Sequence, residues 1–350
     1  MAFLEVNHID HAYGSKTVGL GGVSLQVEEG QIGCLMGPSG SGKTTVLSCI
    51  AGLEPIRAGS IVINSRQLSV ADKTTPPEKR RIGMVFQDFA LFPHLTVAGN
   101  IRFGMTKNGR TDTLNELCEL CGLESLCEAY PHELSGGEQQ RAALARALAA
   151  EPDVLLMDEP FSRLDEVLRE RLAKQVRSIL KSRRLTTLMV THSQHEAFLI
   201  ADVGGVINQG VVCQWDDIYN LYRRPQCAFV AEFVGDGSLL RGVLAADGGV
   251  DMEMGHLQGN TDGERIGCFL SAPGDAVQVL LRPDDIRLDE SGMSAQVEER
   301  AFRGPTTLYA LRLQSGGRVL SEWPSHFNFH LGDNVSVRAQ VKDLVLFPAA

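Results

Sequence analysis

The sequence predicts an α/β domain with a parallel sheet covered by helices on both faces, followed by a smaller all-β domain. Short apolar runs at Ile32–Met36, Val154–Met157 and Thr187–Val190 alternate with helical segments, a pattern typical of parallel sheets. The pattern changes near Gly235-Asp236-Gly237, beyond which short β-type segments dominate. The 350 residues therefore divide into two domains at about this point.

The first domain is expected over residues 1–235. Further strands are expected at Val23–Val27, Ser60–Ile63 and Ile82–Phe86. From about residue 90 to 150, leucine and alanine recur at three-to-four spacing, which predicts a helical subdomain.

The second domain is expected over residues 238–350 as a small barrel-like fold. Ser315-Gly316-Gly317 between two β-type runs predicts a hairpin turn. The expected strands are Ala276–Leu281, Thr306–Leu313, Arg318–Leu320, Val335–Ala339 and Leu344–Phe347.

The bulk composition is that of a globular protein with an acidic surface. The chain is 43% hydrophobic and 22% charged, and its formal net charge is −10. This charge argues against a nucleic-acid partner. The apolar stretches are shorter than the ~18–20 residues of a membrane span, and Met1–Glu5 does not resemble a secretory signal. We expect a cytosolic protein that serves a membrane only through a partner.

The eight cysteines raise the questions of disulfides and metal binding. A cytosolic location argues against disulfides. Cys118-x-x-Cys121, with Cys127 nearby, could suggest a metal site, but no second ligand pair follows at zinc spacing. The spacing favours a helix that packs these cysteines as small apolar side chains. His326, His330 and Cys268 of the β domain could be imagined as an iron sensor, although surface residues without a ligand are the simpler interpretation.

A glycine-rich loop follows the apolar run Ile32–Met36. It fits G-x-x-x-x-G-K-S/T between a strand and a helix, the context in which such a loop binds phosphates. Glycines let backbone N–H groups converge on an anion, and the helix start adds its positive dipole end. Lys43 suits the β and γ phosphates, and the Thr44 hydroxyl suits Mg²⁺. The predicted ATP-binding residues are Gly37, Pro38, Ser39, Gly40, Ser41, Gly42, Lys43, Thr44 and Thr45.

Two carboxylates follow the apolar run Val154–Met157. Asp158 is expected near the Mg²⁺, and Glu159 is placed to accept a proton from an attacking water. The alternative is that Asp158 and Glu159 are an ordinary pair of residues that cap the start of a helix. The presence of the phosphate loop in the same chain makes this alternative the weaker interpretation.

The segment Leu134-Ser135-Gly136-Gly137-Glu138-Gln139-Gln140-Arg141 precedes that acidic pair. The phosphate loop, L-S-G-G and a strand ending in two carboxylates, in this order, resemble the ABC ATPases over residues 1 to about 235. Ser135 can cap the helix that follows, and Gly136 and Gly137 expose N–H groups at its start. The resemblance implies that these three residues grip the γ-phosphate held by a second copy, and hence a homodimer with ATP at its interface.

Further roles are implied only by the resemblance. Tyr13 corresponds to the aromatic residue that stacks on adenine. Gln87 corresponds to the glutamine that contacts Mg²⁺ and water and senses the membrane partner. Asp165 corresponds to the acidic residue of the dimer-contact loop, and His192 to the histidine that holds the γ-phosphate and orients Glu159. The implied catalytic residues are Glu159, His192, Lys43 and Gln87, and the implied Mg²⁺ residues are Thr44, Gln87 and Asp158.

Three positions depart from the family pattern. Arg163 replaces a small residue in the dimer-contact loop, Ser193 follows His192 where an acid is common, and Gly99 stands where Glu is common. The resemblance implies that these departures bear on communication across the dimer and on coupling to the membrane partner.

Two segments, residues 77–97 and Tyr219–Gly235, resemble the ATPases of importers for sugars, sulfate, polyamines and ferric iron. The β domain resembles their accessory OB/TOBE-type domain through Leu281-Arg282-Pro283-Asp284. Its short length and the apolar strand before Pro348 look most like the ferric-iron importer; sulfate, polyamine, thiamine and sugar remain alternatives. The resemblance implies a peripheral location on the cytoplasmic face of the membrane, with permease subunits and an extracytoplasmic solute-binding protein as partners.

Three other functions are alternatives to import. A DNA-repair or chromosome-organising ATPase would carry a coiled coil or zinc module between the loop and L-S-G-G, and the sequence has no sustained heptads there. A translation-associated ABC protein normally carries two cassettes, and this chain has one. A regulatory module that senses ATP is the third.

Overall fold

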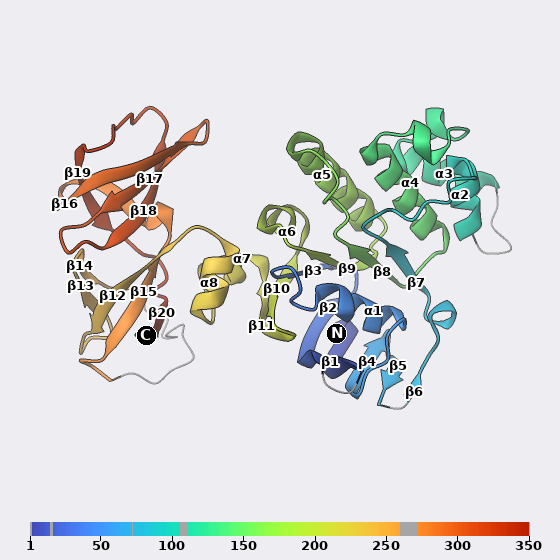
Figure 1. Ribbon diagram of the computed structural model, residues 1–350, viewed down its shortest axis with the longest axis horizontal. Helices are drawn as coiled ribbons and strands as arrows, with labels where there is room; N and C mark the ends of the chain where they lie inside the picture. The colour runs from blue at the N-terminus through green and yellow to red at the C-terminus, as the bar shows by residue number, and fades with distance from the viewer. Residues whose placement is uncertain (1, 15–16, 72, 106–110, 260–271, 350) are drawn as a thin grey trace. The chain divides into compact units, whose positions relative to one another are not determined.

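The computed structural model describes residues 2–14, 17–71, 73–105, 111–259 and 272–349 (Figure 1). It divides into two compact units, Met1–Ile218 and Tyr219–Ala350. No helix among the described residues is both long enough and apolar enough to span a bilayer.

The first unit contains a six-stranded sheet in which the neighbouring strands from β10 to β7 are parallel and the edge strand β11 is antiparallel. The order is β11 (Val211–Asp217), β10 (Val203–Asn208), β3 (Ile32–Met36), β9 (Thr186–Thr191), β8 (Val154–Asp158) and β7 (Ile82–Val85). β3, β8 and β9 are buried along their whole length. The predicted parallel sheet and its apolar core strands are confirmed.

A second, antiparallel sheet of five strands belongs to the same unit, and the sequence predicted only parts of it. Its order is β2 (Thr17–Glu28), β1 (Ala2–Tyr13), β4 (Ala58–Ile63), β5 (Arg66–Val70) and β6 (Lys73–Thr74). β1 pairs with β2 through several register shifts, for example between Val6 and Ile9. These irregularities interrupt the apolar–polar alternation by which a strand is recognised in sequence.

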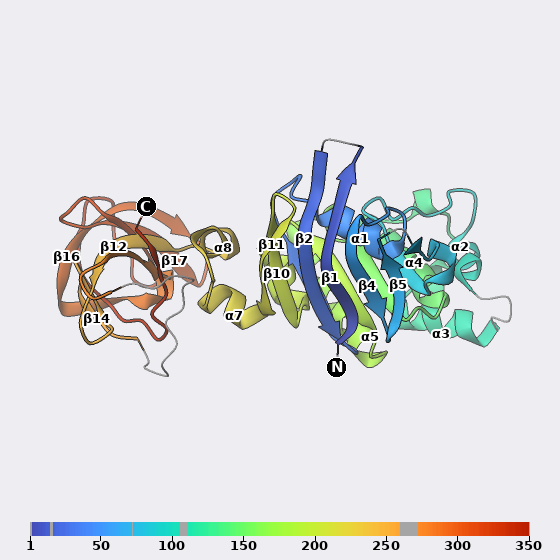
Figure 2. The ribbon, with the colours of Figure 1, turned by 90° about the horizontal axis from the view of Figure 1, so that it is seen from below.

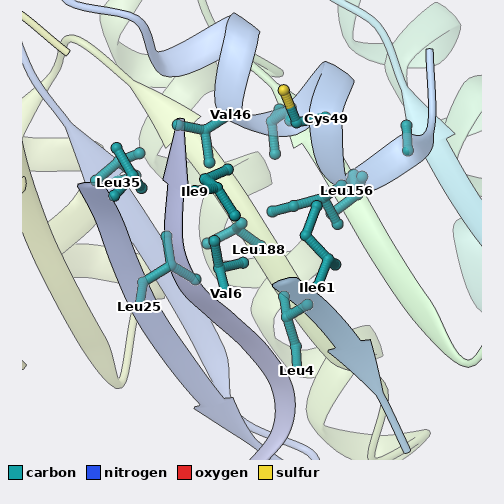
Figure 3. Close-up of a cluster of buried hydrophobic side chains, with 14 of the residues drawn as sticks. Leu4, Val6, Ile9, Leu25, Leu35, Val46, Cys49, Ile61, Leu156 and Leu188 are labelled. Atoms are coloured by element: carbon teal, nitrogen blue, oxygen red, sulfur yellow. The ribbon is translucent and has the colours of Figure 1, made fainter. Parts of the chain in front are cut away.

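Helix α1 (Lys43–Ala51) joins the cores of the two sheets (Figure 3). Its Val46 and Cys49 belong to one buried cluster with Leu4, Val6 and Ile9 of β1. The same cluster contains Leu35, Leu156 and Leu188 of the central sheet. Since α1 is held on both sides, the loop between β3 and α1 has a fixed position at the carboxyl edge of the parallel strands.

Three helices form a group at the opposite end of the unit from β1 and β2 (Figures 1 and 2). They are α2 (Val97–Gly104), α3 (Thr111–Cys121) and α4 (Gly136–Ala149), with the 3₁₀ turns η1 (Pro77–Lys79), η2 (Glu124–Leu126) and η3 (Pro131–Glu133) nearby in sequence. α4 packs against α2, α3 and β7. The predicted helical subdomain is therefore present. Helices α5 (Glu166–Ser182) and α6 (Gln194–Ile200) follow β8 and β9 and pack against each other.

The second unit contains two antiparallel sheets that curve around one buried core (Figure 2). One consists of β14 (Gly255–Leu257), β13 (Val250–Met252), β12 (Ser238–Leu244), β15 (Ala276–Leu281) and β20 (Leu346–Pro348), and the other of β18 (Arg318–Pro324), β17 (Thr306–Arg312), β16 (Ile286–Phe302) and β19 (Asn334–Ala339). The short 3₁₀ turn η4 (Pro283–Asp285) precedes β16. Leu313 N donates to Gly317 O at 2.8 Å, which closes the hairpin turn predicted between β17 and β18.

Helices α7 (Ile218–Arg223) and α8 (Ala228–Val234) fall largely or wholly in the second unit, whereas the sequence placed residues up to 235 in the first domain. Arg282 accounts for this difference. Its side chain is 2% exposed and donates hydrogen bonds to the carbonyl oxygens of Tyr222, Ala231, Gly235 and Asp236. The guanidinium carbon also lies 4.3 Å from the centre of the Tyr222 ring. One buried side chain of the β domain thus ties both helices to it.

Candidate functional site

The loop Gly37–Gly42 connects β3 to α1 and requires glycine at several positions. Gly40 and Gly42 have φ values of +79° and +107°. A Cβ on Gly37 would lie 2.3 Å from the carbonyl oxygen of Ile207, and a Cβ on Gly42 would lie 2.9 Å from Leu20 Cδ2. No side chain of the described residues caps the start of α1. The first N–H groups of α1 therefore remain available to an anion.

Two buried polar groups in this loop fit a phosphate. Lys43 is 5% exposed, and its Nζ donates to the carbonyl oxygens of Gly37 and Pro38 at 2.9 Å each. Burial lowers the pKa of Lys43, against the opposing effect of Glu159 and Asp158. Ser41 is 4% exposed, and within the described part of the chain its Oγ has no hydrogen-bond partner. A phosphate oxygen would satisfy that hydroxyl.

The hydroxyl of Thr44 and the carboxylate of Asp158 meet at the end of β8. Thr44 Oγ1 donates to Asp158 Oδ1 at 3.2 Å. Burial raises the pKa of Asp158, and the hydrogen bond from Thr44 acts in the opposite direction. Among the described residues there is no cluster of three or more His, Cys, Asp or Glu side chains that could hold a metal. This oxygen pair fits Mg²⁺, which usually keeps several waters and binds through one or two protein groups plus substrate phosphates.

Glu159, Gln87 and His192 come together through the order of the sheet. They follow the neighbouring parallel strands β8, β7 and β9, whose carboxyl ends share one edge. Gln87 Nε2 donates to Glu159 Oε2 at 3.5 Å, and His192 Nδ1 lies 3.1 Å from the same oxygen. Glu159 has φ +43°, a left-handed conformation, and its N–H donates to Val190 O at 3.0 Å. The fold thus fixes this carboxylate beside both partners.

Behind His192 lies a buried acidic residue that sequence reasoning missed. Glu196 is 2% exposed and accepts a hydrogen bond from Thr191 Oγ1 at 2.6 Å. Arg169 Nε lies 3.4 Å from the other carboxylate oxygen of Glu196. Burial raises the pKa of Glu196. This network holds the segment that carries His192, and an acidic residue four positions after His192 was the only available sequence signal.

The predicted adenine-stacking residue lies beside the phosphate loop. Tyr13 is 50% exposed, and its Oη lies 3.0 Å from Thr45 Oγ1 of α1. The His11 ring packs edge-on against the Tyr13 ring, with centroids 4.6 Å apart. This contact leaves much of the tyrosine accessible to a ligand.

The segment Ser135–Gly137 begins α4 with a reciprocal capping box. Ser135 Oγ accepts from Glu138 N at 3.4 Å, and Ser135 N donates to Glu138 Oε2 at 2.8 Å. The backbone N–H and the hydroxyl of Ser135 lower the pKa of Glu138. The cap predicted for Ser135 is confirmed.

This helix start and the phosphate loop lie in different surroundings. A Cβ on Gly136 would lie 3.2 Å from Leu164, and one on Gly137 would lie 2.8 Å from Leu172. The phosphate loop instead packs against Leu20 and Ile207. Figure 1 shows α1 with the sheets and α4 with the helical group. The structure brings together the predicted loop, acidic pair, Gln87 and His192, and it leaves Ser135–Gly137 apart from them.

Asp165 acts as a helix cap within this chain. Its Oδ1 accepts from Leu168 N at 2.9 Å at the start of α5. Its neighbour Arg163 is exposed. Of the other two departures, Ser193 caps α6 by accepting from Glu196 N at 3.3 Å, and Gly99 N donates to the N-cap residue Thr96 at 3.2 Å. These two hydrogen bonds explain how Ser193 and Gly99 are accommodated in the fold.

A second feature that sequence reasoning missed links the segment after Gln87 to α4. Phe89 and Ala90 have φ values of +62° and +46°. Arg146 of α4 donates to the carbonyl oxygens of Phe89 and Ala90 at 3.0 and 2.5 Å. The helix that begins at Ser135–Gly137 is therefore tied to the strained turn that follows Gln87.

Comparison with known proteins places the chain in a family. Residues 20–162 match the ABC transporter family, and residues 279–347 match the TOBE domain. An Fe(3+) ions import ATP-binding protein of Mesorhizobium japonicum is 39% identical over 89% of this chain and 88% of that protein.

Two other relatives have different names. A sulfate/thiosulfate import ATP-binding protein of Chromobacterium violaceum is 40% identical over 88% of this chain and 84% of that protein. A spermidine/putrescine import ATP-binding protein of Nitratidesulfovibrio vulgaris is 35% identical over 92% of this chain and 91% of that protein. Together with the two matched domains, these similarities show that the chain belongs to the ATP-binding subunits of ABC importers, which hydrolyse ATP to power transport.

Proposed function

We propose that this chain binds ATP and Mg²⁺ at the carboxyl edge of its central sheet and hydrolyses ATP through Glu159, with ferric iron as the imported solute. Lys43 and the N–H groups at the start of α1 hold the phosphates, and Tyr13 stacks on the adenine. Thr44, Asp158 and Gln87 hold Mg²⁺, which neutralises phosphate charge when bound.

The observation that carries this proposal is the convergence on Glu159 Oε2. Gln87 and His192 both lie within hydrogen-bond distance of that oxygen. Burial lowers the pKa of Lys43, and the negative charge of Glu159 opposes this shift. A carboxylate in this position can accept the proton of a water that attacks a phosphate held by Lys43. His192 orients Glu159 and contacts the terminal phosphate.

The same geometry supports a homodimer. The start of α4 packs on α5 and lies apart from the phosphate loop of its own chain. Ser135–Gly137 of one copy therefore act on the nucleotide of a second copy, with Asp165 at the contact between them. ATP then joins the two copies, and hydrolysis releases them.

As an import ATP-binding subunit, the chain is membrane-associated. We propose that it sits on the cytoplasmic face, bound to permease subunits that receive solute from an extracytoplasmic binding protein. The turn at Phe89 and Ala90, tied to α4 through Arg146, supports a role for this segment in carrying dimer closure to the permease.

The choice of ferric iron is supported by the names of relatives. Ferric-iron import proteins of Mesorhizobium japonicum and Rhodococcus jostii cover 89% and 99% of this chain at 39% and 36% identity. The 40% identity of the sulfate/thiosulfate protein makes sulfate the second candidate.

Glu159→Gln tests the catalytic proposal. ATP affinity should stay within about twofold, because the amide keeps the shape of the carboxylate, whereas turnover should fall ~10²–10⁴-fold with the loss of a general base. Calorimetric titration measures binding and phosphate release measures turnover. Glu166→Gln, in the exposed first turn of α5, is the matched control and should keep full turnover. Near-normal turnover in Glu159→Gln would remove Glu159 from this role.

Radiolabelled uptake tests the solute. Cells lacking the native gene would be supplied with the wild-type chain or Lys43→Ala and given labelled iron(III), sulfate or spermidine. We expect wild-type-dependent uptake of iron alone. Uptake of sulfate or spermidine instead would refute the iron assignment and leave the ATPase proposal intact.

A further inference from the structure

Two cysteine sulfurs lie in contact in the helical group, away from the nucleotide site. The Sγ atoms of Cys118 and Cys127 are 3.1 Å apart, and both residues are free thiols. This separation is about 1 Å longer than the ~2.05 Å bond of a disulfide. A small side-chain movement would bring the two sulfurs to bonding distance.

The local fold creates this contact. α3 ends at Cys121, and Gly122 has φ +61°, which turns the chain back along the helix. Leu123 N donates to Cys118 O at 2.8 Å, and Cys127 Sγ lies 3.5 Å from Leu123 O. The η2 turn thus holds Cys127 against the last turn of α3.

The two thiols differ in their access to solvent. Cys118 is 2% exposed, and burial raises its pKa to about 12, with a further contribution from the hydrogen bond with Cys127. Cys127 is only half-buried. A dissolved oxidant therefore meets Cys127 first, and Cys118 is placed to react second.

We propose that Cys118 and Cys127 form a redox-modification site that a peroxide converts into an intramolecular disulfide. The Cys127 thiolate attacks one peroxide oxygen, the O–O bond breaks, and Cys127 becomes a sulfenic acid while hydroxide leaves and takes a proton. Cys118 Sγ then attacks Cys127 Sγ, the S–O bond breaks, and the departing hydroxide takes the thiol proton of Cys118 as water. Two thiols and one hydrogen peroxide give one disulfide and two waters.

This bond would act on the first turn of α2. Ala98 N donates to Cys127 O, and Val97 N donates to Ala129 O, both at 2.9 Å. The segment that carries Cys127 therefore holds the two leading N–H groups of α2. A disulfide to Cys118 fixes that segment to α3, so opening of these two hydrogen bonds becomes rarer.

The effect extends toward the segment after Gln87. Asn100 of α2 is fully buried and accepts a hydrogen bond from Phe92 N at 2.8 Å. Its Nδ2 donates to Phe92 O and Leu95 O at 3.2 and 3.1 Å. Oxidation of the cysteine pair would thus stiffen a connected stretch from α3 through α2 to Phe92.

Treatment of the purified full-length chain with hydrogen peroxide tests the proposal. Free thiols are blocked after oxidation, disulfides are reduced, and the released thiols are labelled with a second, heavier reagent. Cleavage after glutamate separates the three cysteines, because Glu116, Glu119, Glu124 and Glu128 flank them. We expect the heavy label on Cys118 and Cys127 in equal amounts, in monomeric protein, and its loss after pretreatment with dithiothreitol.

Single variants supply the controls. Cys121 is as buried as Cys118 and lies one turn further along α3, so Cys121→Ser should leave the Cys118–Cys127 disulfide intact. Cys127→Ser and Cys118→Ala should each abolish it, while unchanged ATP binding shows that the variant is folded. Labelling of Cys127 with Cys121, a disulfide between two chains, or a Cys127 that only reaches the sulfinic acid while Cys118 stays free would each overturn the proposal.

Hydrogen exchange of the oxidised chain tests the effect on α2. The amides of Val97 and Ala98 should exchange more slowly in the oxidised wild type and return to the original rate on reduction. In oxidised Cys127→Ser the rates should not change. A disulfide that forms without slowing these amides would overturn the predicted effect on α2.

Discussion

Two helices of the first unit begin at glycine-containing loops, but their starts are satisfied in different ways. α1 begins at Lys43, with no side-chain cap among the described residues and with the buried Lys43 ammonium beside it. α4 begins after Ser135, where Glu138 Oε2 accepts hydrogen bonds from both the N–H and the hydroxyl of Ser135. The first start is open to an external anion, whereas the second already has a carboxylate of its own chain.

This difference indicates that the two helix starts have different roles in nucleotide binding. The start of α1 has positive charge, and among the residues that the structure describes its first N–H groups have no side-chain cap and the Ser41 hydroxyl has no partner, so one chain suffices to bind the phosphates. At the start of α4, a phosphate would compete with Glu138 for the same donors. The α4 start should therefore contribute little to nucleotide affinity in a single chain and act mainly when a second copy presents its ATP.

Of the changes that test this difference between the two helix starts, Lys43→Ala should have the largest effect on ATP affinity. It removes a buried cation, and hydrogen bonds to charged groups are worth ~1.5–3 kcal/mol, so ATP affinity should fall roughly 10- to 150-fold. Calorimetric titration measures this change. Lys174→Ala, which removes an exposed lysine paired with Glu170 on α5, should bind ATP normally. If Lys43→Ala bound ATP with the affinity of the wild type, the backbone N–H groups at the start of α1 would hold the phosphates without the lysine ammonium.

Ser135→Ala should have an intermediate effect on stability and almost none on ATP affinity in the monomer. Loss of an N-cap costs ~0.5–2 kcal/mol, which lowers Tm by about 2–4 °C per kcal/mol in a unit of this size. Thermal unfolding followed by circular dichroism measures the shift. Ser135→Asn keeps an N-cap acceptor, so its Tm should lie much closer to that of the wild type than the Tm of Ser135→Ala. A large loss of monomer ATP affinity in Ser135→Ala would contradict the division between the two helix starts.

Glu138→Gln should give the smallest effect, and it depends on pH. Hydrogen bonds from Ser135 lower the pKa of Glu138 below its unfolded value. Its contribution to stability is therefore complete above the unfolded pKa of about 4.3 and is lost as pH falls through the folded pKa. The Tm of wild type minus that of Glu138→Gln should thus be largest at neutral pH and shrink below about pH 4.3. A constant difference across this range would show that Glu138 does not stabilise α4 through its charge.

Much of the nucleotide site could be predicted because its determinants are local. The loop from Gly37, the acidic pair at the end of β8 and the cap at Ser135 each depend on residues within a few positions of one another. The buried strands of the parallel sheet were equally evident, because they are short, continuous apolar runs.

The rest depends on contacts between distant residues. β1 was missed because its pairing with β2 is irregular, and the role of Arg282 depends on carbonyls about 50 residues away. The left-handed backbone of Glu159 and the contact of Arg169 with Glu196 are likewise set by tertiary structure. The spacing of Cys118 and Cys127 gave no indication that a turn at Gly122 would bring their sulfurs together.

The central claim, that the start of α4 completes the nucleotide site of a second copy, is tested most directly by ATP-dependent dimerisation. Both proteins would carry Glu159→Gln, which prevents hydrolysis; one keeps Ser135 and the other also carries Ser135→Arg. Light scattering would measure the molar mass of each with and without ATP. We predict that ATP converts the first protein from monomer to dimer, and that the second binds ATP equally well but stays monomeric. A Ser135→Arg chain that still dimerises with ATP, or whose monomer no longer binds ATP, would contradict the account.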